Sequence, residues 1–105
     1  MKNATQERRA AKQNERCFGI YRLIEEIFDN LGEGLRLEEI VKATEGFSER
    51  QVLAALKWAE GRKEVVDQGA AGWSRVEAVE QAALATRVEK YRAYLKEQRE
   101  QFAHA

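Results

Sequence analysis

Four residues between two glycines have the types and spacing to recognise a polar surface. Arg50, Ala54 and Lys57 recur at intervals of four and three in the stretch GFSERQVLAALKWAEG, and Gln51 flanks them. In a helix this spacing places all four on one face. Arginine and glutamine can hydrogen-bond to guanine and adenine edges, and a small alanine lets a helix approach a groove closely.

Other cations surround this face. Lys57, Arg62 and Lys63 are suited to contact phosphates, which position a protein without specifying sequence. Arg75, further along the chain, can add one more phosphate contact. The alternative is an ordinary solvated surface, because Glu49 and Glu60 would repel phosphates if they faced a groove.

The first sixteen residues are basic. They carry five cations and two acids, a net charge of +3, whereas residues 17–75 carry eight and eleven, and residues 76–105 carry five of each. Any surface that attracts a polyanion must therefore be local. We expect residues 1–16 to be a basic arm that follows a minor groove or a backbone, or a solvated extension of the first helix. The cations concerned are Arg8, Arg9, Lys12 and Arg16.

The first core helix is expected over residues 17–31. Its apolar positions at helical spacing are Ile20, Leu23, Ile24, Ile27 and Leu31, widened by Tyr21 and Phe28. The glycines of GEG, residues 32–34, are typical of a helix end. Leu35 and Arg36 can form a brief strand before a short second helix that buries Leu37, Ile40 and Val41.

The third helix has a marked start and end. Gly46 can adopt a positive φ, Phe47 can enter the core, and Ser48 with Gln51 predicts a capping box. Gly61 is the expected stop. The buried face is expected to consist of Val52, Leu53, Ala55, Leu56 and Ala59.

A short hairpin follows. Val65 and Val66 on one side, and Trp73 and Val76 on the other, flank the loop QGAAG. We expect Trp73 to pack beneath the hairpin and Trp58 to link the third helix to it. The uncharged loop can touch a nucleic-acid backbone or simply close the core.

This order of elements resembles the winged helix-turn-helix domain of many bacterial, archaeal and phage regulators. The resemblance covers Phe18 to Val76, and its specific part is LEEIVKATEGFSERQVLAALKWAEGRKEVV. Residues at the family's core positions are Ile40, Val41, Gly46, Phe47, Val52, Leu53 and Leu56. The stretch from Val41 to Gly46 is one residue longer than the tightest form of the turn. The resemblance implies a DNA-binding module whose third helix enters the major groove while the wing touches the backbone.

The last segment, from about Val76 to Ala103, is expected to be one long helix. Its apolar seam consists of Leu84, Val88, Tyr91, Leu95 and Phe102, with Gln98 in the same row. Arg87, Arg92 and Arg99 flank the seam, so simple self-pairing along its length would oppose like charges. We expect this helix to pack against first helices, its own or a partner's, and to join two subunits in a homodimer, a plan similar to PadR-type regulators. The alternative is a monomer whose last helix folds back on its own core.

The sequence therefore predicts a mainly α fold with a small β-hairpin: a basic arm at 1–16, a winged helix domain at 17–76 and a dimerisation helix at 77–105. One Cys17 and one His104 provide neither a metal cluster nor a catalytic set, so we expect no cofactor and no enzyme. No apolar run approaches the length of a membrane span, and a cytoplasmic location is expected. The expected partners are double-stranded DNA and a second copy; a protein-binding module without DNA binding is the alternative.

Overall fold

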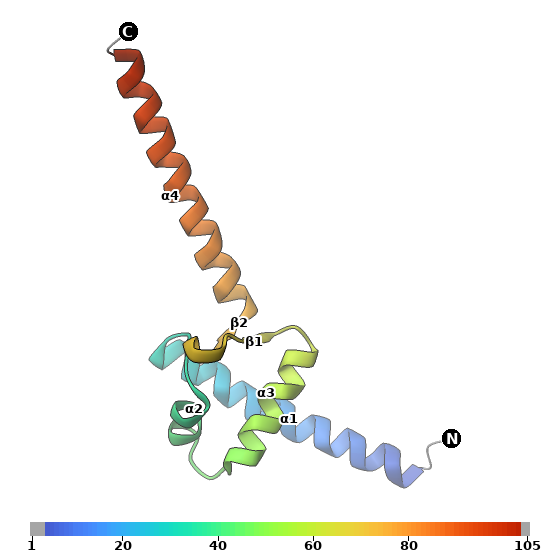
Figure 1. The fold of residues 1–105 in the computed structure, drawn as a ribbon. Coiled ribbons are helices and arrows are strands. Elements are labelled where there is room, and N and C mark those ends of the chain that lie inside the picture. Colours follow the sequence, from blue (N-terminus) through green and yellow to red (C-terminus); the bar gives the residue numbers. More distant parts are fainter. Residues whose placement is uncertain (1–3, 104–105) are drawn as a thin grey trace.

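The computed structural model describes residues 4–103, which are mainly helical and include a small antiparallel hairpin and a long C-terminal helix. The elements are, in order, α1 (Ala4–Leu31), α2 (Leu37–Ala43), α3 (Glu49–Gly61), β1 (Val65–Asp67), a 3₁₀ turn η1 (Gly69–Ala71), β2 (Trp73–Arg75) and α4 (Val76–Ala103). Figure 1 shows a small body built around α3, from which α4 and the first half of α1 project in different directions. His104 lies outside the described residues.

The core lies where α1 crosses α3, with α2 and the hairpin closing its sides. Its fully buried side chains include Ile24, Phe28, Ile40, Val52, Leu56 and Val65. The buried face expected for the third helix is confirmed for Val52, Ala55, Leu56 and Ala59, while Leu53 is partly buried.

Two residues expected on the buried face of the first helix lie outside the core. Leu23 is exposed, and 61% of Leu31 is accessible to solvent, because no neighbouring element covers that side of α1. Cys17 is buried instead, one helical turn before the expected face begins. The helix itself starts at Ala4, so residues 4–16 continue α1 as an extension rather than forming a separate segment.

Glycine ends the first helix as expected, and the third helix also ends at Gly61, as expected. The Gly32 backbone N–H donates to the Phe28 carbonyl at 2.9 Å, and Gly32 adopts a φ of +99°. Gly61 remains helical, and the left-handed conformation falls on Lys63 at φ +62°. Gly46 adopts the expected positive φ, +88°, in the turn before α3.

The hairpin gains a third short partner. Val66 pairs with Ser74 between β1 and β2, and Leu35 pairs with Trp73 on the other side of β2. The brief strand expected at Leu35 is therefore a single bridge. Trp73 is buried beneath the hairpin, as expected. Val76, expected at the end of the strand, is the first residue of α4.

α4 leaves the body after its first turns. From Glu80 to Ala103 every side chain except that of Gln98 is exposed, and Figure 1 shows the helix pointing away from α1. The expectation that this helix packs on its own first helix is therefore wrong, as is the alternative in which it folds back on its own core. The chain measures 76 × 35 × 20 Å along its principal axes as a result.

Candidate nucleic-acid interface

The start of α3 is held by a capping box, as expected. The Gln51 backbone N–H donates to Ser48 Oγ at 3.2 Å, and the Ser48 backbone N–H donates to Gln51 Oε1 at 2.9 Å. These bonds satisfy groups that the first turn of a helix leaves without partners. The backbone of the first turn is thereby fixed, and so is the direction in which the Arg50 side chain leaves the helix.

A shallow cleft of about 450 Å³ separates this turn from the first half of α1. Its lining consists of Arg9, Lys12, Gln13, Arg16, Cys17, Ile20, Arg50, Gln51 and Ala54. Four cations form the rim, whereas Cys17, Ile20 and Ala54 supply an apolar floor. None of these lining residues is acidic, so the rim is a local concentration of positive charge in a chain of zero formal net charge.

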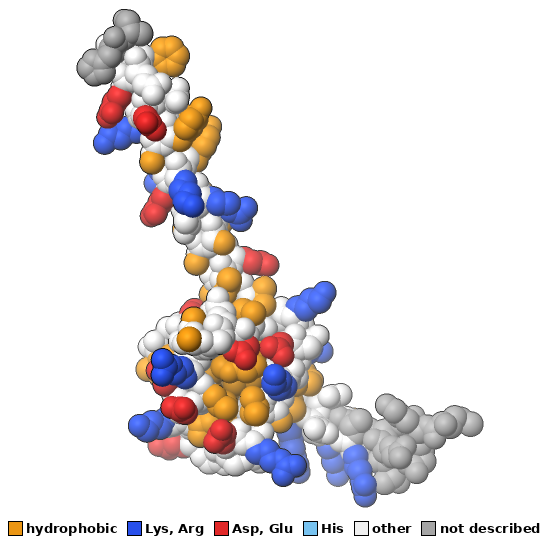
Figure 2. Space-filling view, in the orientation of Figure 1, with side chains coloured by type: hydrophobic (Ala, Val, Ile, Leu, Met, Phe, Trp, Pro, Cys, Tyr) orange, Lys and Arg blue, Asp and Glu red, His pale blue; other side chains and the backbone are white. Residues whose placement is uncertain are grey.

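Two sets of cations that are far apart in sequence thus share one surface, which we call the basic cleft. Figure 2 shows blue side chains gathered where α1 leaves the body. Gln13, Cys17 and Ile20 are lining residues that the sequence reasoning did not assign to a site. The available signal was a spacing of four residues, from Arg9 to Gln13, from Gln13 to Cys17 and from Arg16 to Ile20, because it places these residues on the same side of α1.

Gln51 is less free than its position suggests. Its amide oxygen accepts the Ser48 N–H, so one of the two lone pairs of that oxygen is already used. Pairing with both polar atoms of an adenine edge needs the oxygen and the nitrogen together. In the expected adenine contact this oxygen would be shared with the cap, so Arg50 is the better candidate for a base edge.

Lys57 lies on the outer face of α3, outside the cleft lining. Its Nζ is 3.7 Å from Glu60 Oε1 and 5.8 Å from the centre of the Trp73 ring. The side chain remains 59% exposed, so this ion pair is weak. Lys57 can still contact a phosphate, at the cost of leaving Glu60.

Arg62 and Lys63 lie at the far end of α3. The Arg62 guanidinium sits 5.0 Å from the centre of the Trp58 ring and 3.8 Å from Glu64 Oε1. Lys63 lines a separate hollow with Glu25 and Glu64, among others. Neither residue contributes to the basic cleft.

Trp58 does not link α3 to the hairpin, which corrects the sequence expectation. Its ring contacts α1 instead, with centroids 6.2 Å from Phe18 and 6.3 Å from Tyr21. The cause is the crossing of α1 over α3, which brings the two helices together at this point.

Arg75 is committed to structure. Its Nη1 donates to Asp29 Oδ1 at 2.8 Å, its Nε donates to Glu33 Oε1 at 2.7 Å, and its backbone N–H donates to Glu33 Oε2 at 2.9 Å. Its single positive charge lies beside two carboxylates. Burial by itself would lower the pKa of the guanidinium, but the side-chain hydrogen bonds to Glu33 and Asp29 raise it. We therefore leave Arg75 out of the interface.

Arg8 is exposed on α1 beside the cleft but is not part of its lining. Within residues 4–103, no cluster of three metal-ligating side chains occurs, and no helix is apolar enough over a sufficient length to cross a membrane. The chain matches no protein-family model, no curated protein and no solved structure.

Proposed function

We propose that this protein binds double-stranded DNA through α3 and the basic cleft, as a regulator of transcription or an accessory DNA-binding factor that acts as a homodimer. The observation that carries this proposal is the cleft itself. Arg9, Lys12 and Arg16 lie across from Arg50 on a lining without a carboxylate, although the chain has as many acids as bases.

We infer that the fold is a winged helix-turn-helix. The supporting features are the order of the elements, the capped α3 after a tight turn, and the bridge from Leu35 to Trp73, which gives the hairpin a third short strand. The turn between α2 and α3 runs from Thr44 to Ser48, consistent with the longer connection noted in the sequence.

In this arrangement the two sides of the cleft have different roles. Arg50, in the first turn of α3, reaches base edges in the major groove, and Ala54 permits close approach. Arg9, Lys12 and Arg16 lie along one side of α1 and contact phosphates, which fix orientation without reading sequence. Lys57 adds a phosphate contact on the other flank of α3.

The homodimer in this proposal is supported by α4. Leu84, Val88, Tyr91 and Leu95 are all exposed along a helix that touches its own body only at its base. A two-fold dimer presents two α3 helices to one duplex and doubles the number of contacts.

The hairpin supports a second candidate function, a protein-binding module without DNA binding. Its loop carries no cation, and the charge of Arg75 is already neutralised. Exposed Phe18 beside Trp58 offers an apolar contact of the kind that protein partners use.

The deciding experiment measures binding to a random 30-base-pair duplex at low salt by fluorescence anisotropy. The double variant Arg16→Ala with Arg50→Ala should bind roughly tenfold more weakly and lower the slope of log K against log salt by about 1, because Arg16 contacts phosphate and Arg50 contacts base edges. Lys90→Ala with Lys96→Ala, on α4, is the matched control because it removes the same charge. Absence of binding by the wild type, or an equal loss in the control, favours the protein-binding alternative.

A further inference from the structure

α4 carries an apolar stripe that nothing in the described chain covers. The stripe consists of Leu84, Val88, Tyr91, Leu95 and Phe102, and Phe102 is 80% exposed. Intervals of four and three give a repeat of 3.5 residues, the pattern of a helix that pairs with another helix. Most helical stability in proteins comes from packing an apolar face. The stripe therefore indicates that α4 packs against a second helix.

We propose that α4 pairs with α4 of a second copy of this chain in antiparallel orientation, with Val88 level with Tyr91 of the partner subunit. The inference rests on the homodimer of the proposed function, to which it adds the contacting element, its direction and its register.

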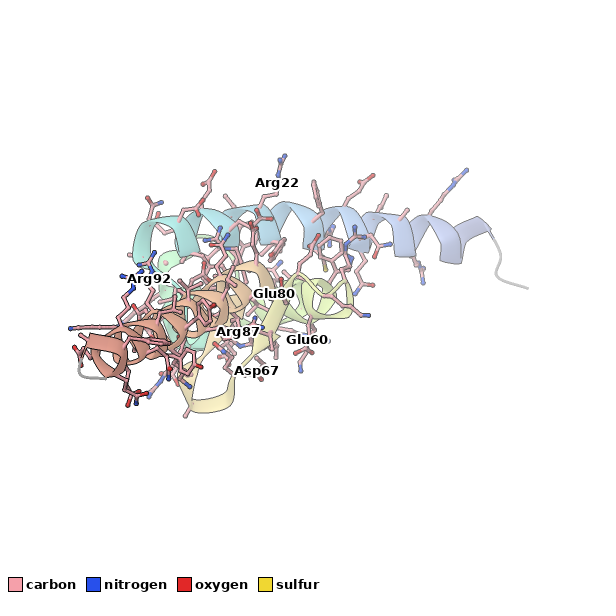
Figure 3. The ribbon with its side chains drawn as sticks, turned by 90° about the horizontal axis from the view of Figure 1, so that it is seen from above. Arg22, Glu60, Asp67, Glu80, Arg87 and Arg92 are labelled. Atoms are coloured by element: carbon pink, nitrogen blue, oxygen red, sulfur yellow. The ribbon has the colours of Figure 1, made fainter. Side chains whose placement is uncertain are left out.

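Parallel pairing is opposed by charge. Helical spacing places Arg87 and Arg92 on opposite flanks of the stripe, and Figure 3 shows the two side chains leaving α4 in different directions. In a parallel pair, residues five apart on the two flanks face each other, so Arg87 would oppose Arg92 of the partner subunit, twice by symmetry. Like charges in register across an interface disfavour that arrangement.

The antiparallel register removes this conflict. Arg87 then faces Tyr94 of the partner subunit, whose ring attracts a guanidinium. Arg92 faces Ala85 of the partner subunit, which is uncharged. Antiparallel helices also bring opposite ends of the helix dipoles together.

The same register matches the stripe with itself. Leu84 meets Leu95 of the partner subunit, and Gln81 meets Gln98 of the partner subunit. The side-chain amides of Gln81 and Gln98, which lie in the same row as the stripe, thus pair with each other instead of facing a leucine or a valine. The symmetry centre falls between residues 89 and 90, the midpoint of α4, so about 42 Å of helix is paired.

The far end of the partner helix arrives at a hollow beside the base of α4. Its acidic residues are Glu25, Glu64, Glu77 and Glu80; its cations are Lys63 and Arg75, and Arg75 is already paired with Asp29 and Glu33. Figure 3 shows Glu80 on the side of α4 that faces the body.

The register places Phe102 of the partner subunit level with Glu77, whereas Glu80, on the same flank as Arg87, faces Gln101 of the partner subunit. The most exposed aromatic ring on the described surface thereby gains cover at the base of α4.

Disulfide formation between introduced cysteines tests the direction. Gln81→Cys and Gln98→Cys are made separately in the full chain with Cys17→Ala, one protein with a tag that changes its mass. After subunit exchange and mild oxidation, the mixture should yield the disulfide-linked heterodimer. Gln98→Cys alone should yield little linked homodimer, because the two introduced thiols lie about 25 Å apart along the pair.

Efficient linkage of Gln98→Cys with itself would overturn the antiparallel direction and leave the dimer in place. A wild-type chain that sediments as a monomer at high micromolar concentration would overturn the dimer as well. Duplex binding by the Arg16 and Arg50 variants is measured independently, so failure of DNA binding is distinguished from failure of the helix pairing.

Discussion

Gln51 both caps α3 through Ser48 and lines the basic cleft. The Gln51 Oε1 accepts the Ser48 backbone N–H at 2.9 Å, and the same residue lines the cleft together with the cations of α1. A single side chain therefore serves the stability of the helix and the electrostatics of the candidate interface. The two roles can be separated by changing its charge and keeping its shape.

Gln51→Glu should leave the fold intact and weaken DNA binding. Glutamate at this position retains the capping acceptor and favours the helix dipole, so the free energy of unfolding should stay within about 0.5 kcal/mol of wild type. A carboxylate in the cleft repels phosphate by about 1 kcal/mol, a roughly fivefold loss of affinity. Urea unfolding and duplex anisotropy measure the two effects; unchanged affinity would remove Gln51 from the interface.

Arg75→Ala should lower the stability of the fold and leave DNA binding nearly unchanged. Losing the bonds to Asp29 and Glu33, which are partly exposed to solvent, should lower the free energy of unfolding by about 1 to 2 kcal/mol. Duplex affinity should stay within about twofold of wild type, because the charge is already neutralised. The measurements are thermal unfolding and anisotropy. An affinity loss as large as that of Arg50→Ala would place Arg75 in the interface.

Tyr21 should make the fold sensitive to alkali. Burial, reinforced by Glu25, raises the pKa of its hydroxyl to about 12. The unfolded chain releases this proton near pH 10, so it holds fewer protons than the folded chain between pH 10 and 12. The free energy of unfolding should therefore fall as pH rises through this window, by up to about 3 kcal/mol.

Tyr21→Phe should flatten that alkaline slope, and Tyr94→Phe, on exposed α4, is the control that should retain it. The measurement is urea unfolding at a series of pH values from 8 to 12. Equal slopes in wild type and Tyr21→Phe would show that another group is responsible.

Gly72→Ala should disrupt the contact between the hairpin and Leu35. Gly72 adopts φ +82° and ψ −159°, a region that is almost restricted to glycine, and an added Cβ would lie 2.5 Å from the Leu35 carbonyl carbon. We expect a loss of about 3 kcal/mol or more. Gly69→Ala, at φ +63° in open space, should cost about 1 kcal/mol. Thermal unfolding of both variants provides the comparison, and similar losses would contradict the steric argument.

Arg87→Glu distinguishes the two directions of α4 pairing by the sign of its effect. In the antiparallel pair it removes two contacts with Tyr94 of the partner subunit and should raise the dissociation constant roughly fivefold. In a parallel pair it would create two attractive contacts with Arg92 and lower that constant. Sedimentation equilibrium measures it, and Lys90→Glu, on the side of α4 away from the stripe, is the matched control.

Local features of the fold were readable from short stretches. Ser48 and Gln51 indicated the start of α3, GEG indicated the end of α1, and the apolar spacing of α3 indicated its buried face. Each of these signals involves residues within one or two helical turns, where backbone geometry alone determines which groups meet.

Contacts between elements that are far apart in the sequence could not be predicted from short stretches. Leu31 has the spacing of a core residue yet is exposed, and Trp58 packs on Phe18 instead of the hairpin. Arg75 resembles a free cation in the sequence, but its two carboxylates lie more than forty positions away along the chain. Such contacts follow from how α1 crosses α3, which no local pattern encodes.

The sequence by itself determined the elements, the cap of α3 and the repeat of α4, because periodicity and capping act over a few residues. Only the tertiary structure decided that the cations of α1 and Arg50 share one cleft, that Gln51 gives its amide oxygen to Ser48, and that α4 stands clear of its own body. The physical reason is that charge pairing and burial depend on distances in space, and the packing of helices on one another sets those distances.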